Sequence, residues 1–167
     1  NNNGDIEYLP NSIKIVDYPG YPRLRNGINP YLSNAKALIF VVDSRNVSDE
    51  AIQNSGELLA HILTRPAFVE QDIPILIACN KTDMHGAKAD GFIFKRLEKE
   101  LDKLKDTRSV LMETEGGDGA EGTNEIMLGT DETFEFDVDV GSGVTSCSCS
   151  CKKRDFGMVE DFLSNLF

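Results

Sequence analysis

The chain has 167 residues, of which 40% are hydrophobic, and its 17 Lys and Arg against 28 Asp and Glu give a formal net charge of −11. This length and apolar content exclude a disordered chain, and we expect residues 1–167 to form a single, partial domain. The acidic balance argues against a basic face for nucleic-acid phosphates, and no apolar run approaches the ~20 residues of a membrane-spanning helix.

The first apolar run is Ile13–Val16, and it leads into the sequence DYPG at residues 17–20. The alternation of apolar side chains predicts a short strand, and the Pro-Gly pair predicts that the strand ends in a turn. The chain starts with NNNG and has no initiator methionine. We therefore expect it to be a part of a longer protein.

Three further apolar runs predict strands: Ala37–Val42, Ile73–Ala78 and, more weakly, Val144–Cys149. The first two are almost continuously aliphatic, which is typical of parallel strands covered on both faces. Helical periodicity lies between and after them, in Ser48–Arg65, in Ala87–Arg108 and from Asp155 onward. Strands that alternate with helices predict an α/β fold with a mainly parallel sheet.

An acidic, Gly-rich segment interrupts this order. Between Ser109 and Cys151 there are ten acidic residues and no basic ones, so the rest of the chain is close to neutral. Such a composition buries too little apolar surface to order itself, which predicts a disordered insertion over residues 112–143. Within its final part, TFEFDVDV (residues 133–140) alternates apolar and polar side chains, which predicts a short edge strand.

The sequence NKTD follows the third predicted strand, at the sheet edge where open α/β folds bind ligands. The carboxylate of Asp83 suits a guanine base, because it can accept hydrogen bonds from both N1–H and the exocyclic amine. The stem of Lys81 can lie along the purine, and Asn80 can tie the loop to its neighbours. The alternative is an ordinary polar turn after a strand.

DxxG followed by NKxD, in this order, is the arrangement of guanine-nucleotide-binding domains. In that arrangement Asp17 holds Mg²⁺ through water, and the backbone amide of Gly20 faces the γ-phosphate of GTP. Glycine is needed because a Cβ would keep the backbone away from the phosphate. A loop of this kind orders or disorders with the γ-phosphate and acts as a switch.

Four stretches make the resemblance specific: DYPGYPRLR (17–25), NPYLSNAKALIFVVDS (29–44), LIACNKTD (76–83) and FIFKRLEKELDKLKDTRS (92–109). Together they resemble the beta subunits of the signal recognition particle receptor, small GTPases of the endoplasmic reticulum membrane. The resemblance implies a Ras-like P-loop GTPase fold with a doubly wound sheet. It also implies that Ser150, Cys151 and Lys152 form a third base-contacting loop.

The resemblance implies GTP and Mg²⁺ as ligands, and the N-terminal domain of the receptor alpha subunit as a partner on the cytosolic face of the endoplasmic reticulum. The ribosome and translocon would be reached indirectly, the membrane through an upstream anchor. The surface of Arg23, Leu24 and Arg25 would contact the alpha subunit; the alternative is a solvated loop with one buried leucine.

The sequence departs from this family in two ways that matter for function. The phosphate-binding GxxxxGK[ST] loop and the strand before it are absent, so this chain alone is also consistent with binding no nucleotide. Tyr21 follows Gly20 where efficient GTPases have a glutamine that orients water, which predicts slow or no hydrolysis.

Two other functions stay open: a nucleotide-free, GTPase-like scaffold that only binds proteins, and a trafficking GTPase of the Arf or Sar type.

Three cysteines raise the question of a metal site: Cys147, Cys149 and Cys151 share one face of the predicted strand. Thiols in a line suit a tetrahedral metal poorly, which favours small apolar packing over a metal site.

Overall fold

The computed structural model describes residues 14–114, 126–129, 133–140 and 143–166. Its strands are β1 (Leu38–Asp43), β2 (Ile75–Asn80) and β3 (Val144–Ser148). Its helices are the 3-10 helix η1 (Pro22–Ile28) and the α-helices α1 (Asn29–Leu32), α2 (Asp49–Leu63), α3 (Pro66–Gln71), α4 (Asp90–Thr114), α5 (Phe136–Asp139) and α6 (Gly157–Ser164).

The three strands form one parallel sheet in the order β1-β2-β3. Leu38 lies opposite Ile75, which in turn lies opposite Val144, so the strands start and end level with one another. In β2 every residue before Asn80 is buried, because this strand is central and covered on both faces. All three strands therefore present their carboxyl ends at one edge of the sheet.

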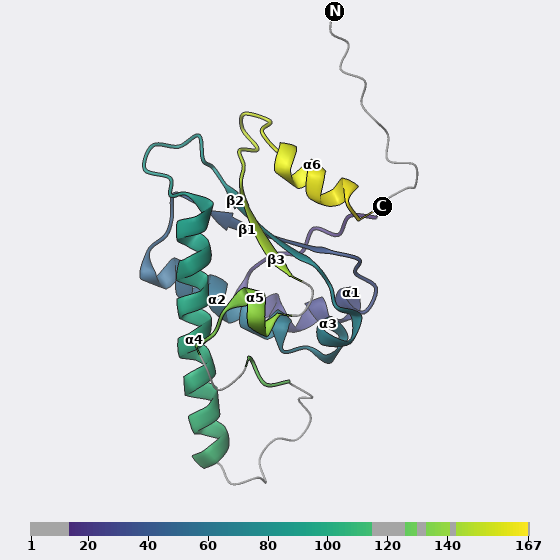
Figure 1. Cartoon of the computed structure of the whole chain (residues 1–167), viewed down its shortest axis with the longest axis vertical. Helices are drawn as coiled ribbons and strands as arrows, with labels where there is room; N and C mark the ends of the chain where they lie inside the picture. The colour runs from purple at the N-terminus through teal and green to yellow at the C-terminus, as the bar shows by residue number, and fades with distance from the viewer. Residues whose placement is uncertain (1–13, 115–125, 130–132, 141–142, 167) are drawn as a thin grey trace, which may run out of the picture.

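The two faces of the sheet are covered unequally. Helices α2 and α4 pack on one face, and the short α6 lies across the other (Figure 1). The larger core contains Ile77, Leu97 and Leu101, all 0% exposed. The smaller one, beneath α6, includes Leu76 and Cys147. The predicted α/β fold with a parallel sheet and helices on both faces is confirmed.

Local signals explain where α2 begins and how closely it approaches α4. The hydroxyl of Ser48 accepts a hydrogen bond from the N–H of Ala51 (3.2 Å), which caps the helix. Gly56 of α2 lies against α4, and a Cβ there would sit 2.8 Å from Cγ of Glu100. The lack of a side chain at this glycine therefore permits the close helix contact.

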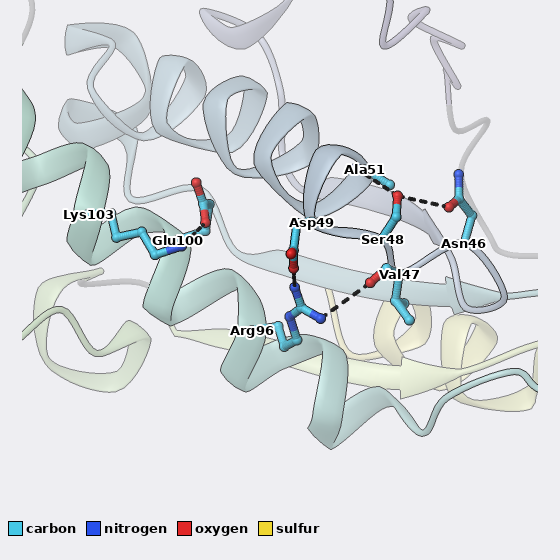
Figure 2. A network of polar contacts seen from close by, with 8 residues as sticks. All are labelled: Asn46, Val47, Ser48, Asp49, Ala51, Arg96, Glu100 and Lys103. Atoms are coloured by element: carbon cyan, nitrogen blue, oxygen red, sulfur yellow. Dashed lines mark hydrogen bonds and ion pairs between the residues drawn. The ribbon is translucent and has the colours of Figure 1, made fainter.

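A polar contact reinforces the same helix pair beside the loop that follows β1. Figure 2 shows the guanidinium of Arg96, on α4, reaching the start of α2. It donates to the carbonyl of Val47 (3.3 Å) and pairs with the carboxylate of Asp49 (2.5 Å). The side chain of Asp49 is 99% exposed, so we expect the ion pair to contribute little stability and mainly to fix the loop position.

The strand predicted at Ile13–Val16 is wrong for the part that the structure describes. Residues 14–20 have no strand assignment, and the side chain of Ile15 is 81% exposed. None of the described strands pairs with this segment. Without a neighbouring strand, its backbone has no ladder to join, whatever its side-chain pattern.

The edge strand predicted within residues 133–140 is also wrong, because α5 forms there. The rings of Phe134 and Phe136 are buried and contact each other edge to face, 5.4 Å between centroids. Their backbone N–H groups donate to carboxylates of α4, at Asp102 (2.8 Å) and Glu98 (3.1 Å). The segment thus satisfies its backbone on a helix instead of on a strand.

The acidic insertion predicted at residues 112–143 lies partly outside the described residues, which omit 115–125, 130–132 and 141–142. Its described parts contribute four buried apolar side chains: Leu128, Phe134, Phe136 and Val140.

Among the helices that the structure describes, none combines the length and apolar character needed to cross a bilayer.

Candidate functional site

The loops that follow β2 and β3 meet at the carboxyl edge of the sheet. The side-chain oxygen of Asn80, at the end of β2, accepts hydrogen bonds from the N–H of Lys81 (2.7 Å) and from the N–H of Cys151 (3.0 Å). Thr82 adds a second link, because its hydroxyl donates to the carbonyl of Cys149 (2.8 Å). The two loops predicted to contact the base are therefore joined into one unit.

Asp83 is held at this junction by a buried hydroxyl. Oδ1 of Asp83 accepts a hydrogen bond from the hydroxyl of Ser150 (2.7 Å), and Ser150 is 1% exposed. The same hydroxyl accepts from the N–H of Lys153 (3.2 Å). The Ser150 bond, with nearby Lys152 and Lys153, lowers the pKa of Asp83, so this carboxylate is ionised at neutral pH.

Lys81 has an unusual backbone and a specific partner. Its φ is 69°, in the left-handed region that non-glycine residues rarely adopt. Its ammonium pairs with Asp43 at the end of β1 (2.6 Å). That contact lowers the pKa of Asp43, which also accepts hydrogen bonds from the N–H groups of Arg45 and Asn46. The ends of all three strands thus contribute residues to the same site. Lys81 itself connects the ends of β1 and β2.

The structure leaves Asp17 and Gly20 apart from this unit. Asp17 and Gly20 lie in an exposed, irregular segment. A Cβ on Gly20 would lie 3.6 Å from Leu58 of α2, so the segment runs beside that helix. Lys152 is exposed in the turn after β3. The structure brings Asn80, Lys81 and Asp83 together with the Ser150 loop but does not bring Asp17 to them among the described contacts.

Two carboxylates at this edge of the sheet, Asp43 and Asp90, were not predicted from the sequence. The carboxylate of Asp90, in the first turn of α4, accepts hydrogen bonds from the hydroxyls of Ser146 (3.1 Å) and Ser148 (2.9 Å) on β3. These bonds explain why alternate positions of β3 are serines, since they face a charged helix start. The available signals were Asp43 at the end of a predicted strand and Asp90 near the start of a predicted helix.

The opposite side of β3 carries the cysteines. Cys147 and Cys149 are buried beneath α6, which confirms the predicted packing as small apolar side chains for these two. For Cys151 the prediction is wrong, because it lies beyond the end of β3 and is exposed. Burial raises the pKa of Cys79 to about 12 and that of Cys149 to about 11. These thiols therefore stay protonated at neutral pH, whereas metal binding requires the thiolate.

A family model matches most of the chain, including the loop after β2. The model of the signal recognition particle receptor beta subunit matches residues 2–140. The chain belongs to this family. The assignment confirms the resemblance drawn from the four sequence stretches and decides against an Arf- or Sar-type GTPase.

Curated relatives carry the same description. The signal recognition particle receptor subunit beta of Mus musculus is 37% identical over 105 residues, which are 62% of this chain and 39% of that protein. The Saccharomyces cerevisiae subunit is 33% identical over 135 residues, 75% of this chain and 55% of that protein. The matched region of the chain therefore spans 39% to 55% of the length of these two relatives.

Solved structures support the fold. A structure of the mammalian SRP receptor superposes with a TM-score of 0.71 at 30% identity, covering 89% of this chain and 71% of that one. A receptor subunit from Chaetomium thermophilum, described as SRb-GDP, gives a TM-score of 0.66 at 24% identity, covering 90% and 77%. At that identity the second match shows the fold alone.

Proposed function

We propose that this chain is the base-binding part of a GTP-dependent receptor subunit, which recruits the alpha subunit to the endoplasmic reticulum membrane for co-translational protein targeting. The observation that carries the proposal is the joined pair of loops, with Asn80 binding the Cys151 amide and Ser150 holding Asp83. Related structures described as SRb-GDP and as an SRb-GTP/SRX complex add support from the same fold.

The chemistry of the junction favours guanine. Asp83 is ionised and presents acceptor oxygens, which match the two donors on the Watson–Crick edge of guanine and not the donor–acceptor pattern of adenine. The Cys151 amide is already used by Asn80, so we assign the guanine O6 contact to the next amide, at Lys152. The aliphatic stem of Lys81 would cover one face of the base.

Exchanging Asp83→Asn tests this assignment. The amide would offer a donor where guanine also has one, but xanthine has a carbonyl there, so we expect GTP affinity to fall about 100-fold and XTP affinity to rise. Competition against a fluorescent GTP analogue measures both, with Asp161→Asn on α6 as the exposed control. Unchanged selectivity for GTP over ATP in the Asp83 variant would remove this residue from the site.

The proposed magnesium ion would lie on the phosphate side of the site. Asp17 would hold Mg²⁺ through water, as the family resemblance implies. The described residues contain no cluster of three His, Cys, Asp or Glu side chains placed for a metal, and Asp17 is exposed. One carboxylate does not make a six-oxygen magnesium site, so we derive no step through the metal.

Recruitment of the alpha subunit would use the surface after residue 20. Leu24 is 47% exposed, whereas Arg25 is tied to Glu57 by an ion pair of 2.9 Å. We therefore assign the contact to Arg23 and Leu24 and a structural role to Arg25. Exchanging Leu24→Asp should weaken capture of the alpha-subunit N-terminal domain about tenfold, with Met158→Asp on α6 as control.

GTP turnover by this protein should be slow or nil without a partner. Tyr21 is 57% exposed directly after Gly20, and its phenol cannot copy the paired donor and acceptor of a glutamine amide. Single-turnover hydrolysis of GTP, measured on a form that binds it, checks this expectation. Turnover at the rates of partner-stimulated GTPases, with no partner added, would contradict it.

One observation favours the second candidate, a nucleotide-free scaffold. Ile15 is 81% exposed and Asp17 is exposed as well, so the described residues hold the phosphate-side segment loosely. Calorimetry with GTP and GDP, followed by capture of the alpha-subunit domain with and without nucleotide, separates the candidates. Capture that is independent of nucleotide, by a chain that binds none, would establish the scaffold.

A further inference from the structure

A cavity of about 180 Å³ lies at the amino-terminal edge of the sheet, opposite the candidate base site. Its walls come from the ends of α2 and α3, from residues 126–129 and from the end of α5. Helix α3 directly precedes β2 and α5 directly precedes β3, so both lie where the parallel strands begin (Figure 1). A six-residue strand, about 20 Å long, separates the two sites.

The inner wall of the cavity is apolar and belongs to the core. Leu63, Phe68, Leu128 and Val140 line it, and each is at least 94% buried. An apolar cavity of about 150 Å³ stays dry and admits benzene, so this volume suits one apolar side chain of leucine, methionine or phenylalanine size. Water would find few partners on such a wall.

The rim of the cavity exposes apolar side chains to solvent. Val69 of α3 is 47% exposed, Ile126 is 39% exposed and Met127 is 64% exposed. Single exposed apolar residues need no explanation, but three around one apolar cavity form a contiguous patch. Methionine suits such a surface because its flexible thioether adapts to different partners.

The charged side chains among the residues that line the cavity are acidic. Asp72 and Asp139 line the cavity, and Glu70, Glu135 and Asp137 lie in the same two segments. Neither Pro66–Asp72 nor the described residues between 126 and 140 contain Lys or Arg. This charge is a separate observation from the apolar wall, and it selects a cationic occupant.

We propose that this cavity, with its rim at Val69, Met127 and Asp72, is a docking site for a basic peptide segment of a partner protein. One apolar side chain of the segment enters the cavity, and flanking Lys or Arg side chains meet the carboxylates of the rim. The site lies at the opposite edge of the sheet from Asn80 and Asp83.

Fluorescence anisotropy with a labelled KKLFKK peptide tests the proposal on the whole chain. We expect KKLFKK to bind, and both KKSSKK and EELFEE to bind about tenfold more weakly or worse, because each lacks one of the two required features. Binding of KKLFKK should weaken at 500 mM salt through screening. Equal binding of KKSSKK, which would indicate charge attraction alone, or of EELFEE would overturn the proposal.

Rim variants locate the peptide. Met127→Ser and Asp72→Asn should each weaken KKLFKK about threefold, while the exposed α6 variants Met158→Ser and Asp161→Asn should not. Asp72 has a φ of 49°, which asparagine also adopts, so its exchange removes the charge without straining the backbone. Equal weakening by the α6 controls would overturn the proposal. So would a dimer of the chain that Met127→Ser dissociates, because the cavity would then bind a second copy of the chain.

Discussion

The base-side loops and the segment at residues 17–20 carry the two halves of one sequence pattern, yet they are held in different ways. Asn80 and Ser150 connect their loops through two side-chain hydrogen bonds, to the Cys151 amide and to Asp83. The DYPG segment is irregular, and Asp17 is exposed. A motif therefore predicts which residue types are present, whereas cross-loop hydrogen bonds decide whether they are positioned.

The difference has a simple cause in the sheet. Residues 80–83 and 150–152 follow neighbouring strands β2 and β3, whose parallel register brings their carboxyl ends together. Residues 17–20 follow no described strand of the sheet. If this interpretation is correct, substitutions on the base side should disturb the fold measurably, and substitutions at the DYPG segment should not.

The largest expected effect is that of Asn80→Ala. It removes the acceptor for two backbone N–H groups, those of Lys81 and Cys151, at a position where Lys81 already has an unfavourable φ. We expect the free energy of unfolding to fall by about 2 kcal/mol in urea titrations. Asn165→Ala, at the exposed end of α6, is the control and should change it by less than about 0.5 kcal/mol.

A smaller effect should follow from Ser150→Ala. The exchange removes the hydroxyl that lowers the pKa of Asp83, so this pKa should rise toward its usual value of 3.8. In the native chain the stabilising contribution of ionised Asp83 is present above pH 3.8 and is lost as the pH falls through the lowered folded pKa. In the variant the folded and unfolded pKa values lie closer together, so this contribution should be smaller.

A carboxylate NMR titration measures the Asp83 pKa directly. Ser148→Ala is the matched control, because Ser148 lies two positions earlier, at the end of β3, and its hydroxyl donates to Asp90 instead of Asp83. An Asp83 pKa that stays low in Ser150→Ala would mean that the nearby lysines, not the hydroxyl, hold it down. The junction would then be weaker than its geometry indicates.

Much of the fold could be predicted from local pattern. The runs at Ala37–Val42, Ile73–Ala78 and Val144–Cys149 each contain most of a strand, because buried parallel strands are marked by continuous apolar residues. The helix predicted at Ser48–Arg65 was marked by acidic residues in its first turn, and α2 spans Asp49–Leu63. These signals are short-range and need no knowledge of a partner.

The features that were predicted wrongly or not at all depend on contacts between residues far apart in the chain. Phe134 and Phe136 alternate like strand residues, but their backbone partners are carboxylates on α4, more than 30 positions earlier in the chain. Likewise, the serines of β3 are understood only through Asp90, 56 and 58 positions away. In the site, NKTD was found from its motif, whereas Asp43 was missed because a carboxylate at a strand end has no motif of its own.

Lys81→Met should sharpen the comparison with a still smaller effect. The exchange keeps the aliphatic stem and removes the ammonium that lowers the pKa of Asp43, so this pKa should rise. Because both side chains are substantially exposed, at 54% and 36%, the loss of stability at neutral pH should be at most about 0.5 kcal/mol. The contribution of ionised Asp43, present above pH 3.8 and lost as the pH falls through the lowered folded pKa, should therefore be smaller than in the native chain.

The smallest effect is predicted for Asp17→Asn. The side chain is exposed and the exchange is nearly isosteric, so the free energy of unfolding should change by less than about 0.5 kcal/mol. Urea titration beside Asn80→Ala gives the direct contrast between the two halves of the motif. A fall in the free energy of unfolding of more than about 1 kcal/mol would mean that Asp17 has a partner in the folded chain. The contrast between base-side loops fixed by hydrogen bonds and a loosely held DYPG segment would then be wrong. An unchanged stability, combined with weaker magnesium-dependent GTP binding in a form that binds the nucleotide, would place Asp17 in function and outside the forces that hold the fold.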